Sequence, residues 1–156
     1  MNKKLLAEDI QVAVVGLGYV GLPLAAAFGR HYSTVGFDID HERISELLRG
    51  HDSTLEVSGD ELAEARLLRF SGDPQDIASC NVYIVTVPTP IDRAKRPDLS
   101  ALRSASHAVG QILSEGDVVI YESTVYPGAT EEDCAPILEQ ISGLRLNKDF
   151  SFFTFF

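Results

Sequence analysis

The stretch Gly16-Leu17-Gly18-Tyr19-Val20-Gly21 decides the fold of this chain. It follows the apolar residues 10–15 and precedes residues 22–30, which have the composition of a helix, so the order is strand, glycine turn and helix. A second apolar segment, residues 34–37, ends at Asp38, about twenty residues beyond the first glycine, where a dinucleotide-binding βαβ unit places its ribose-binding acid. The sequence therefore predicts a βαβ unit that binds a dinucleotide.

Each glycine of this turn has its own physical role. Gly16 permits the tight turn, Gly18 removes the side chain that would block a pyrophosphate, and Gly21 lets the helix pack closely on the sheet. The pyrophosphate would lie at the helix N-terminus, beside Tyr19 and Val20, because free N–H groups and the positive end of the helix dipole favour an anion. These five residues are therefore predicted to bind the cofactor.

Length and composition describe an acidic globular domain. A chain of 156 residues with 45% hydrophobic residues is long enough to bury one core, and its net charge of −10 disfavours nucleic acid as a partner. Cys80 and Cys134 have neither the spacing of metal ligands nor an extracellular disulfide pattern, so we expect no metal site. The N-terminus resembles neither a signal peptide nor a membrane span, which predicts a cytoplasmic protein without a membrane partner.

The remaining chain alternates strand-like and helix-like segments. The β-branched residues 81–87 and the apolar residues 117–122 are typical of strands buried on both faces of a parallel sheet. Weaker candidates are a short strand at residues 69–70 and a helical turn at residues 74–78. Helices are expected at residues 42–49, at 59–68 with Leu62, Ala65 and Leu68 on one face, at 98–113 with Asp98 as N-cap, and from a capping box of Thr130 and Asp133 to residue 141. This alternation predicts an α/β fold, a Rossmann-like doubly wound parallel sheet in a single domain.

Ligands of such sheets collect at the carboxyl ends of the strands. The segments expected there are residues 16–21, 38–43, 86–92 and 123–128. Thr89 and Thr124 follow strands that are otherwise apolar. From their position alone, each threonine is either a ligand contact or a hydroxyl that closes a turn.

Three segments resemble a known family. They are Gly-Leu-Gly-Tyr-Val-Gly-Leu-Pro at residues 16–23; Val-Thr-Val-Pro-Thr-Pro-Ile-Asp at residues 85–92, followed by Arg-Pro-Asp-Leu at residues 96–99; and Tyr-Glu-Ser-Thr-Val-Tyr-Pro-Gly-Ala-Thr-Glu-Glu-Asp-Cys at residues 121–134. Together they resemble the NAD-binding domain of the UDP-glucose/GDP-mannose dehydrogenase family, and most closely its UDP-N-acetylhexosamine 6-dehydrogenase branch. The resemblance implies an enzyme that oxidises the C6 alcohol of a UDP-sugar to a carboxylate with two NAD, for surface polysaccharides.

The resemblance also implies roles for individual residues. Val20, Asp38, Arg43, Thr89 and Thr124 match positions that contact NAD in the family. Asp38 would accept both ribose hydroxyls and repel the 2′-phosphate of NADP. Arg43 would lie beside the adenosine, unless it is an ordinary solvated helix cation. Thr124 would lie near the nicotinamide and the reacting sugar, and it is the candidate catalytic residue.

The resemblance ends at Ser151. The family continues with Phe-Phe-x-Gly-Tyr-Ser-Pro-Glu-Arg, whereas residues 151–156 read Ser-Phe-Phe-Thr-Phe-Phe. We therefore expect an NAD-binding domain at residues 1–150 and an atypical Phe-rich tail at residues 151–156, in a truncated chain without the thiolate nucleophile of the family. Neither Cys80 nor Cys134 is placed to substitute for that nucleophile, so this chain alone is expected to be inactive.

The Phe-rich tail and the function each leave alternatives open. The tail would be a sixth strand at the sheet edge, the product of truncation or a shifted reading frame, or a partner-binding or membrane-touching segment. Because it is uncharged and apolar, we expect it to cause self-association.

The alternative functions are a stand-alone NAD-binding module without catalysis and a β-hydroxyacid dehydrogenase.

Overall fold

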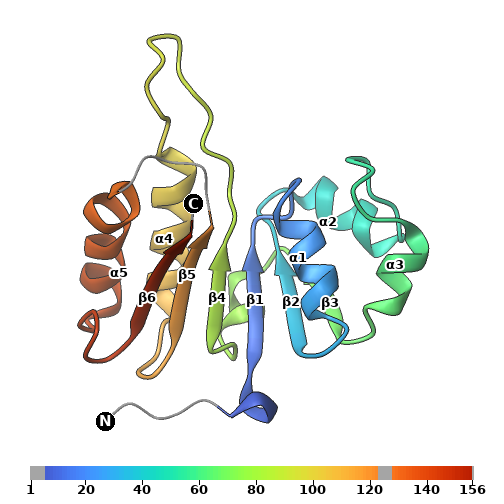
Figure 1. Ribbon diagram of the computed structural model, residues 1–156, viewed down its shortest axis with the longest axis horizontal. Coiled ribbons are helices and arrows are strands. Elements are labelled where there is room, and N and C mark those ends of the chain that lie inside the picture. Colours follow the sequence, from blue (N-terminus) through green and yellow to red (C-terminus); the bar gives the residue numbers. More distant parts are fainter. Residues whose placement is uncertain (1–5, 123–127, 156) are drawn as a thin grey trace.

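A single parallel sheet organises the molecule. The computed structural model describes residues 6–122 and 128–155. All six strands are parallel, in the order β3-β2-β1-β4-β5-β6 (Figure 1). They are β1 (Gln11–Val15), β2 (Ser33–Phe37), β3 (Leu68–Ser71), β4 (Val82–Val85), β5 (Val118–Glu122) and β6 (Ser151–Phe155). The chain changes direction across the sheet between β3 and β4, so the sheet opens a crevice between β1 and β4 at their carboxyl ends.

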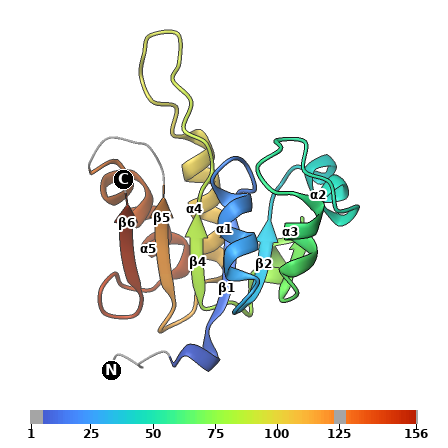
Figure 2. The same cartoon turned by 45° about the vertical axis from the view of Figure 1, so that its right-hand side comes forward.

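Helices cover both faces of this sheet. The helical segments are η1 (Ala7–Asp9), α1 (Gly21–Phe28), α2 (His41–Leu48), α3 (Gly59–Glu64), η2 (Pro74–Ile77), α4 (Ser100–Ile112), η3 (Thr130–Cys134) and α5 (Ala135–Ser142). Residues of α1, α2 and Ala65 beyond α3 join one buried cluster, and residues of η2, α4 and α5 join the other (Figures 1 and 2). The fold is therefore the expected doubly wound α/β domain.

The two hydrophobic clusters follow from the alternation of side chains along the strands. In β1, Val12 and Val14 belong to the cluster beneath α1, whereas Ala13 and Val15 belong to the cluster beneath α4. Successive side chains of a strand point to opposite faces, so a central strand must be apolar at every position. Burial on both faces explains why these strands are continuous apolar runs in the sequence.

No helix in the described ranges, 6–122 and 128–155, is long and apolar enough to cross a membrane.

The helix expected at residues 59–68 is shorter than predicted. Helix α3 ends at Glu64, and Leu68 begins β3, where it pairs with Thr34 of β2. The backbone N–H of Thr34 also donates to Leu67 at 3.0 Å. The helical spacing of apolar residues was misleading because Leu68 pairs with a neighbouring strand instead of extending the helix. Of the three residues expected on one helix face, only Ala65 is fully buried.

Two predicted helix caps also differ from the structure. The residue before α4 is Leu99 rather than Asp98, although the Asp98 carboxylate still accepts the Ser100 N–H at 2.9 Å. The capping box of Thr130 and Asp133 does not form. The first turn there is the wide π-type turn η3, so the Thr130 hydroxyl lies against Glu131 and Asp133 is paired with Arg103.

The Phe-rich residues 151–155 form the edge strand β6. One of their faces packs on the sheet: the Phe152 ring lies 5.2 Å from that of Tyr121, and the Thr154 hydroxyl donates to Glu131 at 3.2 Å. The other face remains open, since Phe153 is 51% exposed and Phe155 57% exposed. Of the alternatives for the tail, the structure shows a sixth strand.

A buried carboxylate lies at the opposite end of the sheet from the crevice. Asp117 precedes β5 and accepts the Ser114 N–H at 2.8 Å, and burial raises its pKa to about 6. The folded protein therefore holds the Asp117 proton more tightly than the unfolded chain does. Between about pH 4 and pH 6 the free energy of unfolding should fall as pH rises. Above about pH 6 it should stay at this lower value, because the buried Asp117 carboxylate is then charged.

We expect Asp117→Asn to remove this penalty. The variant should match the wild type near pH 3.5 and be more stable at pH 7.5, by up to about 3 kcal/mol. Thermal unfolding at the two pH values measures the difference, with the exposed Asp73→Asn as the matched control. A stability difference that does not depend on pH would contradict the shifted pKa.

Candidate cofactor-binding site

A cavity of about 540 Å³ lies at the carboxyl ends of the strands, within the range of small-molecule sites. It brings together the loops that follow β1, β2 and β4 and one side of α4. Its described lining consists of Val15, Gly16, Leu17, Gly18, Phe37, Asp38, Ile39, Asp40, Arg43, Val87, Pro88, Ser100, Ala101, Ser104, Ala105 and Ala108. Four of the predicted cofactor residues, Gly16, Gly18, Asp38 and Arg43, therefore share one cavity.

The glycine turn is fixed by close packing behind the cavity. Gly16 has φ +99°, a left-handed conformation, and its N–H donates to Phe37 at 2.8 Å. A Cβ on Gly21 would lie 1.7 Å from the Gly16 carbonyl oxygen. The buried Thr86 hydroxyl donates to that same oxygen at 2.7 Å. Glycine is thus required at positions 16 and 21 by the packing of the fold, independently of any ligand.

Gly18 has a different role because its neighbourhood is open. A Cβ there would meet no atom of residues 6–122 or 128–155 within 4 Å. Tyr19 and Val20, which follow it, are exposed at the start of α1, and the first turn of α1 carries no acidic side chain that would repel an anion. The absence of a side chain at Gly18 therefore leaves room for a ligand group rather than for another part of the fold.

Asp38 lies at the end of β2 and faces the glycine turn. One carboxylate oxygen accepts the Leu17 N–H at 2.9 Å, and the other accepts the Asp40 N–H at 2.9 Å. A carboxylate oxygen can accept more than one hydrogen bond, so both oxygens retain capacity for a ribose diol. Asp38 therefore lies beside the glycine turn at the end of β2, and its contact with a ribose diol stays a prediction.

Arg43 is buried against the turn and is not the solvated cation of the alternative interpretation. Its side chain is only 9% exposed, and Nε donates to the Leu17 carbonyl at 2.8 Å. Nη1 is paired with Glu46 and, at 2.8 Å, with Asp52. Within the described residues, Nη2 is buried without a hydrogen-bond partner. Arg43 is also one of the residues that line the cavity.

Of the two predicted threonines, the described residues include only Thr89. Thr89 is half-buried in the loop after β4 and lies outside the described lining. That loop projects beyond the carboxyl ends of the strands, closed by an antiparallel bridge between Ile91 and Pro97 (Figure 2). Thr124 falls outside the described residues, so its predicted place beside the nicotinamide remains a prediction.

Sequence reasoning missed two parts of the site. Thr86 was placed in the strand 81–87 and in the segment 86–92 at the strand ends, but its contact with the glycine turn was not predicted. The wall formed by α4 was also missed, although Ser100, Ser104 and Ala108 recur at spacings of four residues and place small side chains on one helix face. Small side chains there leave space between α4 and the glycine turn.

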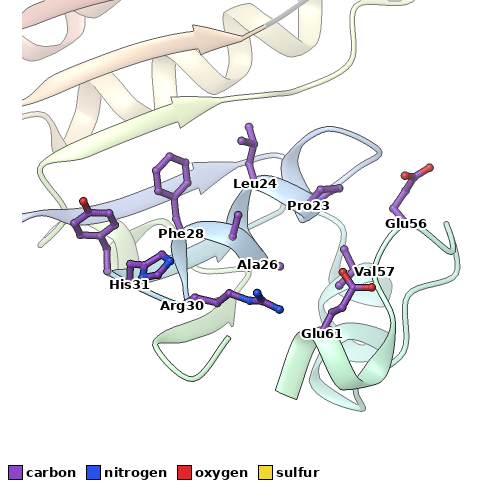
Figure 3. Close-up of a pocket in the computed structure, with 11 residues that line it drawn as sticks. Pro23, Leu24, Ala26, Phe28, Arg30, His31, Glu56, Val57 and Glu61 are labelled. Atoms are coloured by element: carbon purple, nitrogen blue, oxygen red, sulfur yellow. The ribbon is translucent and has the colours of Figure 1, made fainter. Parts of the chain in front are cut away.

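A second cavity, of about 550 Å³, lies on the outward side of α1 (Figure 3). Leu24 and Phe28 of α1 form one side, and Glu56, Val57 and Glu61 form the other. It lies away from the carboxyl ends of the strands, where ligands of such sheets bind, and its lining mixes acidic Glu56 and Glu61 with basic Arg30 and His31. We therefore assign the cofactor to the first cavity.

The parts of the chain that the structure describes hold no group of three metal-ligating side chains.

A parallel sheet of this order, with a glycine turn after β1 and an acid at the end of β2, defines a dinucleotide-binding domain. The sequence profile described as "UDP-glucose/GDP-mannose dehydrogenase family, NAD binding domain" matches residues 10–154. The chain belongs to this family, and its cofactor is NAD.

Individual relatives support the same assignment. The chain is 63% identical to a UDP-N-acetyl-D-glucosamine 6-dehydrogenase of Pseudomonas aeruginosa and 53% identical to one of Salmonella typhi, each over 92% of this chain and 34% of the relative. A solved UDP-D-ManNAc dehydrogenase from Pyrococcus horikoshii matches with a TM-score of 0.86 at 37% identity, over 92% of this chain and 35% of that one. The chain thus spans about a third of the length of the relatives it matches.

Proposed function

We propose that this chain binds NAD across its glycine turn as the cofactor domain of a UDP-N-acetylhexosamine 6-dehydrogenase. The observation that carries the proposal is the shared cavity of Gly18, Asp38 and Arg43. The adenosine ribose would bind Asp38, and the pyrophosphate would lie over Gly18 at the start of α1. Arg43, which lines the same cavity, would lie beside the adenosine half.

Calorimetric titration of the chain with NAD and NADP tests this proposal. NAD should bind more tightly because the Asp38 carboxylate accepts a ribose diol and repels a 2′-phosphate. No binding of NAD, or equal binding of both cofactors, would contradict the assignment of this cavity.

The sugar substrate is proposed from the relatives. Those with the highest identity quoted above are named for UDP-N-acetyl-D-glucosamine, so the class of substrate is a UDP-N-acetylhexosamine whose C6 alcohol is oxidised to the uronate. As part of this proposal, the protein would be located in the cytoplasm, and its product would be used in the synthesis of surface polysaccharides. Val20, Thr89 and Thr124 complete the proposed NAD contacts, with Thr124 nearest the reacting sugar.

We expect no measurable turnover by this chain alone. Oxidation of an alcohol to an acid in two steps needs a nucleophile that captures the aldehyde intermediate. Both cysteines are buried, burial raises the pKa of the Cys80 thiol to about 11, and burial also raises the pKa of Cys134. An assay of NADH formation with UDP-N-acetylglucosamine, UDP-N-acetylgalactosamine and UDP-glucose measures this. Robust turnover of any of the three would contradict it, whereas binding of NAD without turnover is the expected result.

We further propose that β6 makes the chain self-associate. It is an edge strand without a charged side chain, and the exposed Phe153 and Phe155 lie on its open face. Sedimentation at increasing concentration should show association by the wild type, whereas Phe153→Lys with Phe155→Lys should stay monomeric because charge blocks edge pairing. The double change to Ser is the uncharged control. A monomeric wild type at high concentration would contradict the proposal.

A further inference from the structure

Both backbone groups of Leu17 are held by charged side chains of the protein itself. Asp38 accepts the Leu17 N–H at 2.9 Å, and Arg43 Nε donates to the Leu17 carbonyl at 2.8 Å. Leu17 lies between Gly16 and Gly18, so these two contacts set the conformation of the glycine turn. A fixed turn does not have to be ordered when the ligand binds, and this raises affinity.

Arg43 is in turn held by Asp52, whose side chain is fully buried. One Asp52 oxygen accepts from Arg43 Nη1 at 2.8 Å and from the N–H and hydroxyl of Thr54 at 2.9 Å and 2.7 Å. The other oxygen accepts the N–H groups of Glu56 and Val57 at 2.9 Å and 3.0 Å. Burial alone would raise the pKa of Asp52, but the hydrogen bonds from Thr54 and Arg43 hold it well below the usual range.

We propose that Asp52 is a positioning residue for the cofactor site: through Arg43, it holds the glycine turn in its binding conformation and couples that turn to residues 52–57. Asp52 itself lies outside the described lining of the cavity, behind Arg43. The inference rests on the proposed NAD site, because it assigns a preorganising role to a group that does not touch the ligand.

The chemistry of the link requires a carboxylate and a guanidinium. Both oxygens of Asp52 accept hydrogen bonds from N–H donors, so an amide at this position would bring its own NH₂ group against one of them. A lysine in place of Arg43 would have one nitrogen to contact both Leu17 and Asp52, whereas the guanidinium contacts them with two separate nitrogens. Asp52→Asn therefore breaks the link while preserving shape.

Reciprocity gives a test in the wild-type protein. If the Asp52 contacts stabilise the binding conformation, cofactor binding must stabilise the Asp52 contacts by the same free energy. Saturation with NAD should therefore slow hydrogen exchange of the Glu56 and Val57 amides, which lie outside the cofactor cavity. The Gln75 amide, bound to Asp73, is the control that should not change.

The decisive experiment compares Asp52→Asn with Tyr83→Phe. Tyr83 is buried and donates to Ile77 and Cys80 near the amino end of β4, so its change destabilises the fold away from the cavity. In calorimetry well below both unfolding temperatures, Asp52→Asn should weaken NAD about tenfold, whereas Tyr83→Phe should leave affinity unchanged. Without ligand, only Asp52→Asn should speed hydrogen exchange at the Leu17 amide.

The outcomes separate this inference from the function on which it rests. A wild type that does not bind NAD overturns the proposed function, while the Leu17 exchange still reports on the link. A wild type that binds NAD, with Asp52→Asn at unchanged affinity and unchanged Leu17 exchange, overturns the inference. If Asp52→Asn does not fold, wild-type exchange decides: protection of Leu17 by NAD without protection of Glu56 and Val57 overturns it.

Discussion

Gly21→Ala should destabilise this protein more than any other single methyl group placed in the turn. The added Cβ would lie 1.7 Å from the Gly16 carbonyl oxygen and 2.5 Å from the Thr86 hydroxyl. The first contact is with backbone, so no rotamer change relieves it and α1 must move away from β1. We expect a loss of at least about 3 kcal/mol in the free energy of unfolding, or roughly 10 °C in Tm, together with loss of NAD binding.

Gly18→Val is the matched control because it adds more atoms at a glycine three residues earlier in the same turn. The protein leaves open space there, so the variant should keep the wild-type Tm. It should nevertheless weaken NAD and NADP alike by crowding the pyrophosphate. Thermal unfolding and calorimetry of the two variants separate a glycine that the fold requires from one that the ligand requires. Equal Tm values for both variants would contradict the assignment.

The sequence predicts the turn well because its causes are local. Gly16 and Gly21 are needed within one strand-turn-helix unit, and Asp38 lies at a distance along the chain that the βαβ geometry sets. The continuous apolar strands predict double burial for the same reason. These features depend on neighbours in sequence or on a recurring unit, so a pattern suffices to find them.

The features that sequence reasoning missed depend on contacts between distant segments. Thr86 lies 70 residues from Gly16, whose carbonyl it contacts, and no spacing rule connects them. Asp52 is only nine residues from Arg43, but the contact requires the particular path of residues 52–57. Arg43 itself was found through family resemblance, and the structure adds its burial and its ion pairs with Glu46 and Asp52.

The errors in secondary structure have the same origin. Leu68 fits the helical spacing of residues 59–68, yet pairing with Thr34 places it in the sheet. Thr130 and Asp133 fit a capping pattern, yet the wide turn of η3 and the ion pair with Arg103 use them otherwise. In each case a tertiary contact overrides a local preference, and such contacts are strongest where elements meet.

Asp38→Asn should produce the largest loss of cofactor affinity that leaves the core unchanged. A hydrogen bond to a charged group contributes about 1.5–3 kcal/mol, so losing the charge toward the ribose should weaken NAD by about 10- to 100-fold. The loss is compounded because both carboxylate oxygens accept backbone N–H groups, from Leu17 and Asp40. An asparagine must turn its NH₂ toward one of these donors, which loosens the turn that it should hold.

The same substitution should narrow the preference for NAD over NADP. The carboxylate disfavours the 2′-phosphate through charge repulsion in a partly buried site, and the amide removes that repulsion. Asp40→Asn is the matched control: it removes one charge from the same cavity wall but keeps a good N-cap for α2, so affinity should change by no more than about threefold. Calorimetry with both cofactors on the three proteins measures all of these effects. Equal losses of NAD affinity in the two variants would mean that the charge of the cavity matters and the position of Asp38 does not. A larger loss for Asp38 would instead assign the ribose to the end of β2, because Asp38 both accepts the Leu17 N–H of the glycine turn and lines the cavity.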